Sequence, residues 1–185
     1  KAASGLGEVE VLLESRFDQF PSGVISDGRL VYQEIHESSG SDIWLLPVSG
    51  DPEPWLVTPV EEGFAQPSPS GEVMAYMTNV SGRFEISIQD IDRVFDPLRI
   101  STNGGTNPIW SSSGERLYFR QGHQLMVSDI STESVLAASV PNVIFGGGWE
   151  LSHQGEPLFS SYGAMSGDRF LMIRHPPESV PTRIN

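Results

Sequence analysis

Three glycines recur at a fixed interval along the chain: Gly28, Gly71 and Gly114 lie 43 residues apart. Each belongs to a short polar turn, and a run rich in large side chains follows it. Further turns rich in Gly, Ser, Asn and Pro divide each period into four short segments of β-strand character. A chain with a period of this length is restricted to a row of similar units that bury their faces against one another.

A period of this size with four strands per unit predicts an all-β fold, a β-propeller made of four-stranded antiparallel blades. The chain holds material for about 3.5 to 4 blades, so the propeller is small or partial. The predicted blades span residues 20–58, 63–102, 105–138 and 139–185. Residues 1–7 are predicted to be a flexible end, and residues 8–185 form one domain.

The segment Glu8–Glu14 alternates charged with apolar residues, which predicts an outer strand. This strand would complete the fourth blade and close the ring within one chain. Alternatively, two copies join end to end as a homo-oligomer that completes the propeller. Either closure would cover the sheet edges and apolar faces that an open row of blades exposes.

Residues two apart in the third segment of each unit share one sheet face and are predicted to fill the space between blades. These pairs are Leu30/Tyr32, Met74/Tyr76 and Leu117/Phe119. The structural turn residues Gly28, Gly71 and Gly114 are predicted to hold positive φ, where a Cβ would clash. The tryptophans Trp44, Trp55 and Trp110 lie inside predicted strands and are interpreted as packing residues.

Composition excludes several classes of partner. The chain carries 24 acidic and 11 basic residues, a net charge of −13, which argues against binding nucleic acid or an anionic membrane surface. It has no cysteine, hence no disulfide or thiolate metal site. No apolar run approaches the ~20 residues of a membrane span, so we expect no membrane insertion.

The sequence does not predict an enzyme. It lacks the glycine-rich loop, strand lysine and catalytic loop of a kinase, and Lys1 is its single lysine. No Gly-x-Ser-x-Gly elbow of a serine hydrolase is present. The four histidines are scattered singly, so we expect no metal site and no cofactor.

Two places are candidate binding surfaces. The first is the mouth of the central channel, which the loops leading into the innermost strands surround in a propeller. Its candidate residues are Asp18, Gln19, Glu61, Glu62, Gln66, Asn103, Thr106 and Asn107, a polar and acidic set suited to a peptide or cationic group. The second is the insertion Phe145–Ser160, whose aromatic residues Phe145 and Trp149 favour either an interaction site or packing against the fourth blade.

Two runs resemble a known family: N-G-G-T-N-P-I-W-S-S-S-G-E-R-L-Y-F-R (residues 103–120) and D-R-F-L-M-I-R (residues 168–174). They are similar to TolB-like β-propeller repeats, and most to the C-terminal propeller region of bacterial serine/threonine protein kinases. The resemblance implies a bacterial, non-catalytic module that binds a protein or peptide, as the sensor or scaffold part of a larger signalling protein.

The compartment would be extracytoplasmic for the sensor part of a membrane kinase and cytoplasmic otherwise. Two alternatives stay open. One is the gating propeller of a prolyl-oligopeptidase-like peptidase that lacks its catalytic domain, and the other is a stand-alone, self-assembling propeller fragment.

Overall fold

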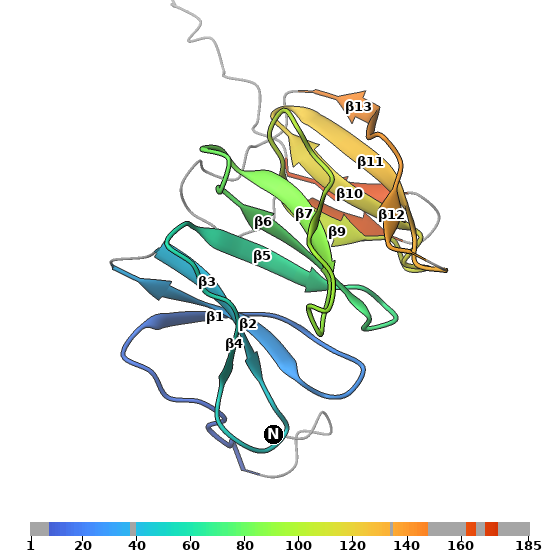
Figure 1. Cartoon of the computed structure of the whole chain (residues 1–185). Helices are drawn as coiled ribbons and strands as arrows, with labels where there is room; N and C mark the ends of the chain where they lie inside the picture. Colours follow the sequence, from blue (N-terminus) through green and yellow to red (C-terminus); the bar gives the residue numbers. More distant parts are fainter. Residues whose placement is uncertain (1–7, 38–39, 134, 148–161, 166–168, 174–185) are drawn as a thin grey trace, which may run out of the picture.

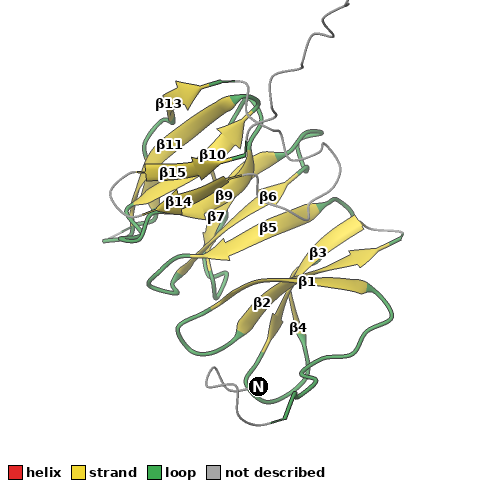
Figure 2. Ribbon diagram, turned by 180° about the vertical axis from the view of Figure 1, so that it is seen from behind, coloured by secondary structure: helices red, strands yellow, loops and turns green. Residues whose placement is uncertain are grey.

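The computed structural model describes residues 8–37, 40–133, 135–147, 162–165 and 169–173 (Figure 1). Every regular element in these ranges is a β-strand (Figure 2). The strands are β1 (Asp18–Val24), β2 (Leu30–His36), β3 (Gly40–Leu46), β4 (Glu53–Leu56), β5 (Glu62–Pro67), β6 (Val73–Thr78), β7 (Glu85–Asp90), β8 (Leu98–Arg99), β9 (Thr106–Trp110), β10 (Arg116–Gln121), β11 (Gln124–Ser131), β12 (Ala137–Ala138), β13 (Asn142–Gly146), β14 (Tyr162–Met165) and β15 (Arg169–Met172). Within these ranges, no helix has the length and apolarity needed to cross a membrane.

Consecutive strands pair antiparallel and make three blades: the first sheet (β1–β4), the second sheet (β5–β8) and the third sheet (β9–β12, with β13 also paired to β11). The second sheet lies between the other two (Figures 1 and 2). The strands β14 and β15 form a hairpin beside the third sheet. The predicted all-β architecture of four-stranded antiparallel blades is therefore confirmed.

Apolar clusters fill the space between the first and second sheets and the space between the second and third sheets. Successive side chains of a strand point to opposite faces, so the second sheet contributes to both clusters. The cluster between the first and second sheets contains Val31, Ile43, Leu45, Trp55, Met74, Tyr76 and Ile91, among others. The cluster between the second and third sheets includes Ile86, Ile88, Trp110, Leu117 and Phe119. Burying each such side chain contributes roughly 1.5–3 kcal/mol. In the first sheet the inter-blade position belongs to Val31 and not to Leu30 or Tyr32, a shift of one residue from the prediction.

The three hairpin-turn glycines adopt the predicted positive φ. Gly28, Gly71 and Gly114 have φ values of 93°, 77° and 78°. A Cβ on Gly71 would lie 2.4 Å from the Ser26 Oγ and 3.0 Å from the Ser26 backbone nitrogen. The second turn therefore rests directly on the first sheet, and glycine is needed there for contact as well as for conformation.

The strand predicted over Glu8–Glu14 is absent: residues 8–15 have no regular structure, and β1 begins only at Asp18. Val9, Val11 and Leu12 are exposed. Alternation alone provides no stability, because a strand needs the hydrogen bonds of a partner edge. The first sheet already has four strands between residues 18 and 56.

The region predicted to be the fourth blade begins differently. Phe145 is not in a loop but in β13, where it pairs with Leu125 of the third sheet. β12 and β13 both pair with β11, so the outer strand of the third sheet is split into two pieces. Pro141 lies between the two pieces, and its missing N–H fits an edge position. Most of the predicted insertion, with Trp149, lies outside the described residues.

Candidate functional site

The three inner strands begin at one rim of the molecule. Asp18, Glu62 and Thr106 are the first residues of β1, β5 and β9, at a constant spacing in the sequence. β1 contacts β5, and β5 contacts β9, so the three strands are neighbours. We call Asp18, Glu61, Glu62 and the loop 101–106 the strand-start rim. The structure thus brings most of the predicted channel-mouth residues to one end of adjacent sheets.

The rim residues differ in exposure. Asp18, Glu61 and Asn103 are exposed, and Thr106 is partly exposed. Each of the three exposed residues comes from a different blade, at or just before the inner strand. These side chains are the ones that a ligand at this end of the molecule would meet.

Other predicted residues serve the fold. The Gln19 amide donates to the Glu34 carboxylate (Nε2 to Oε2, 2.7 Å). The Gln66 amide reaches the Ser22 carbonyl in the first sheet. Asn107 is 1% exposed. Phe145 meets Phe170 of the β14–β15 hairpin at a centroid distance of 5.9 Å and an interplanar angle of 67°.

A bulge recurs in each inner strand. The pairing with the second strand shifts after Pro21, after Gly63 and opposite the segment 107–108. Phe64 and Asn107 adopt left-handed φ values of 50° and 54° there, which for a bulky Phe costs of order 1–3 kcal/mol. The bulge lets the Phe64 N–H donate to Gln33 Oε1 (2.9 Å), and the Asn107 carbonyl accepts the Tyr162 hydroxyl (2.7 Å). The first bond joins the second sheet to the first, and the second bond joins the third sheet to the β14–β15 hairpin.

Glu62 is a buried carboxylate at the rim, with 2% of its surface exposed. The Thr58 hydroxyl donates to its Oε1, while Oε2 has no hydrogen-bond partner. Burial raises the pKa of Glu62 to about 7, and the Asp42 carboxylate adds to the rise. The Thr58 hydrogen bond and the positive charge of Arg93 act in the opposite direction. Glu62 therefore holds its proton to near neutral pH.

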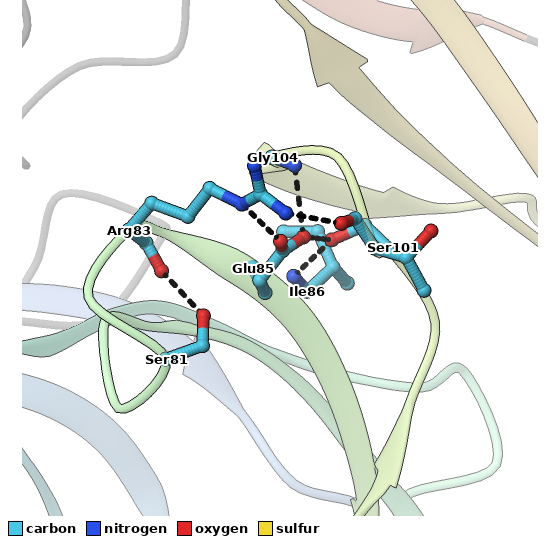
Figure 3. A network of polar contacts seen from close by, with 7 residues as sticks. Ser81, Arg83, Glu85, Ile86, Ser101 and Gly104 are labelled. Atoms are coloured by element: carbon cyan, nitrogen blue, oxygen red, sulfur yellow. Dashed lines mark hydrogen bonds and ion pairs between the residues drawn. The ribbon is translucent and has the colours of Figure 1, made fainter.

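Glu85 anchors the rim loop that carries Asn103, as Figure 3 shows. Its Oε2 accepts the Ser101 hydroxyl and the Gly104 N–H (3.0 Å), and its Oε1 pairs with the Arg83 Nε at 2.7 Å. Ser101 in turn accepts the Ile86 N–H (2.8 Å). Although burial opposes ionisation, these hydrogen bonds and the Arg83 charge lower the pKa of Glu85 below its ordinary value.

Sequence reasoning missed Glu85, although a signal existed. Asp42 occupies the same position one repeat earlier. Asp42 is buried in β3, and Glu85 is buried in β7. Thr58 and Ser101 likewise lie 43 residues apart and precede the next inner strand. A buried acidic residue in the third strand of the sheet and a hydroxyl residue before the next sheet thus recur in the first and second blades.

The side chains of the strand-start rim are suited to hydrogen bonding. Among the described residues, no group of three acidic or histidine side chains could hold a metal ion. The exposed rim groups are two carboxylates and an amide, which accept and donate hydrogen bonds. The arrangement is suited to binding a polar or cationic group.

Comparison with known proteins identifies the fold. No family model matches the sequence, and no curated protein matches it. The chain is similar to a solved structure from Agrobacterium tumefaciens assigned as TolB, with a TM-score of 0.53, 19% identity, and coverage of 70% of this chain and 51% of that chain. TolB from Acinetobacter baumannii gives a TM-score of 0.46 and 20% identity over 68% of this chain and 32% of that chain.

The class of protein that the fold defines is the β-propeller with four-stranded blades, and the A. tumefaciens structure shares this architecture. The chain spans about half the length of the A. tumefaciens structure. At this level of identity the likeness describes the architecture and leaves the ligand to be argued from the chain's own residues.

Proposed function

We propose that the chain is a non-catalytic propeller module that binds a protein or peptide segment at the strand-start rim. The observation that carries the proposal is the exposure of Asp18, Glu61 and Asn103 on neighbouring blades. A rigid frame supports them, because the Glu85 network fixes the loop of Asn103 and the Asn79 side chain accepts the Glu61 N–H (3.2 Å). The net charge of −13 favours a cationic segment.

The finer proposal is that this module is the sensor or scaffold part of a larger signalling protein. Its support is the resemblance of residues 103–120 and 168–174 to the C-terminal propeller region of bacterial serine/threonine kinases. In such a protein the catalytic step belongs to another domain, and the propeller supplies recognition.

A selection experiment tests the binding function. Random 12-residue peptides displayed on phage are selected on the immobilised chain, and enriched peptides are synthesised and measured by fluorescence polarisation. We expect basic peptides to be enriched. The rim variant D18N/E61Q/N103A should weaken their binding about tenfold, which corresponds to about 1.4 kcal/mol.

The matched control is Glu53→Gln, an exposed acid in the outer strand β4. It makes the net charge less negative by one, where the rim variant makes it less negative by two, and it should leave peptide binding unchanged. Failure to enrich any peptide above the uncoated surface would refute the proposal. Equal binding by the rim variant and the parent would refute the assignment of the rim.

A further inference from the structure

A cavity of about 230 Å³ lies between the second and third sheets. Its walls are the hairpin turn after β5, the hairpin turn after β9, and the end of β11 with the residues that follow it. These turns follow the ends of the inner strands, so the cavity lies at the opposite end from the strand-start rim. We call this space, which includes Glu72, Trp110, Glu115, Ile130 and Glu133, the junction cavity.

The junction cavity combines an apolar floor with an acidic edge. Val73, Trp110 and Ile130 are buried, whereas Glu72, Glu115 and Glu133 are exposed. No Arg or Lys lines it. Within the described part of the chain, none of the three glutamates forms an ion pair. The site thus offers uncompensated negative charge around an apolar surface.

The charges are too widely spread for a bare metal ion, since no triad of ligating side chains occurs in the described residues. A guanidinium group matches this arrangement better. It is planar and delocalised, it donates five hydrogen bonds, and its apolar stem covers hydrophobic surface.

The preceding junction, between the first and second sheets, holds an arginine at the equivalent repeat position. Arg29 occupies the repeat position of Glu72, 43 residues earlier. Its Nε lies 2.7 Å from an Asp27 oxygen, and its Nη2 lies 3.7 Å from an Asp92 oxygen of the second sheet. The Arg29 side chain is only 25% exposed, so an arginine is held between the first and second sheets.

The walls of the two junctions correspond. The Ile91 N–H donates to the Glu72 carbonyl (3.0 Å), and the Ile130 N–H donates to the Glu115 carbonyl (2.8 Å). Asp92 and Ser131, the residues after these isoleucines, therefore hold equivalent places. The second junction has glutamate where the first has arginine, and no arginine or lysine lines its cavity.

We propose that the junction cavity binds an arginine side chain of a partner protein. The stem lies against Trp110 and Ile130, and the guanidinium pairs with Glu72 and the glutamates across the cavity. The cavity is a second contact surface, separate from the rim, so this proposal stands or falls independently of the rim assignment.

Solution NMR of the whole 185-residue chain tests the proposal with N-acetyl-arginine amide as the probe. The indole N–H of Trp110 and the amide of Gly114 should shift saturably, with a Kd on the order of 1 mM. N-acetyl-citrulline amide, the neutral isostere, should bind at least about tenfold more weakly because it lacks the charge. No saturable shift, or equal shifts with both probes, would overturn the proposal.

Variants locate the site. Glu72→Arg gives the second junction the cation of the first and should abolish the shifts, while Glu53→Arg, with the same charge change on β4, should preserve them. E115Q/E133Q, which adds no bulk, should weaken binding about tenfold and keeps the test valid if Glu72→Arg does not fold. The rim variant D18N/E61Q/N103A should bind the arginine probe like the parent. Unchanged affinity in both cavity variants would overturn the assignment.

Discussion

The indole N–H of Trp110 donates to the backbone carbonyl of Gln66, at 2.9 Å, and so ties the inner strand of the third sheet to that of the second. Gln66 stands at the same repeat position one blade earlier, and its own side chain reaches the Ser22 carbonyl at 3.4 Å. Neighbouring inner strands are therefore connected by a side-chain donor and a main-chain acceptor at a constant offset. Trp110 is a packing residue, as its place in a strand predicts, but it also has this directional role.

Trp110→Phe should destabilise the fold by roughly 1–3 kcal/mol, because the Gln66 carbonyl loses its donor in a largely buried place. Urea unfolding followed by circular dichroism measures the change. Trp44→Phe is the matched control, since the buried Trp44 Nε1 has no hydrogen-bond partner and its removal leaves no acceptor unsatisfied. Equal losses in the two variants would show that ring volume, and not the hydrogen bond, dominates.

Gly71→Ala should cost clearly more stability than Gly82→Ala. Both glycines have positive φ, 77° and 86°, so both variants pay about 1 kcal/mol for the left-handed conformation. A Cβ at position 71 also meets Ser26, whereas nothing lies within 4 Å at position 82. We expect Gly71→Ala to lower the free energy of unfolding by about 1 kcal/mol or more beyond the loss in Gly82→Ala, which a lower urea midpoint would show. Indistinguishable midpoints would mean that the turn moves away from Ser26 without cost.

The sheets could be predicted from the sequence because their signals are local. Turn glycines, hydroxyl residues and alternation are read within a few residues, and Gly28, Gly71 and Gly114 occupy the expected turns. The same local pattern misled at Glu8–Glu14, because alternation describes the faces of a strand and not the edge with which it pairs. Phe145 was assigned to an insertion, whereas it lies in β13, because its pairing with Leu125 of β11 joins segments 20 residues apart and leaves no local pattern.

The site was less accessible to sequence reasoning because it depends on contacts between blades. Nothing local indicates that the Gln66 side chain turns back to Ser22, or that Phe64 takes a left-handed φ. Glu62 and Glu61 are adjacent in the sequence, yet one is buried and the other exposed. Which of the two residues is buried depends on how the second sheet packs on the first, and the local sequence does not show this packing.

Glu62 should make stability depend on pH. Its pKa rises from an ordinary value of 4.5 to about 7 in the folded chain, so the folded state binds more protons than the unfolded state between these values. The contribution of the protonated group is complete below about pH 4.5 and is lost as pH rises through about 7.

Glu62→Gln should therefore stabilise the chain at pH 8 by roughly 1–3 kcal/mol and have little effect near pH 4. Urea midpoints across this pH range measure the difference. Glu61→Gln, at the exposed neighbour, provides the control and should shift the midpoint little. A pH-independent difference between Glu62→Gln and the parent would contradict a raised pKa.

Glu85→Gln should loosen the rim loop 101–106 and destabilise the chain by roughly 1–3 kcal/mol. A neutral amide takes the place of the carboxylate, so the charge-assisted hydrogen bonds that the carboxylate accepts are weakened or lost. Amide hydrogen exchange at Gly104 and Ile86 should accelerate, since the first loses its acceptor and the second depends on Ser101 being held.

Because the pKa of Glu85 is lowered in the folded chain, its contribution to stability is present above the ordinary carboxyl pKa and lost in acid, so the stabilities of variant and parent should converge as pH falls. Glu53→Gln should leave exchange at both amides unchanged. Unaltered protection of Gly104 in Glu85→Gln would show that the backbone bonds of the loop, such as Gly105 N–H to the Phe84 carbonyl at 2.9 Å, hold it without the carboxylate.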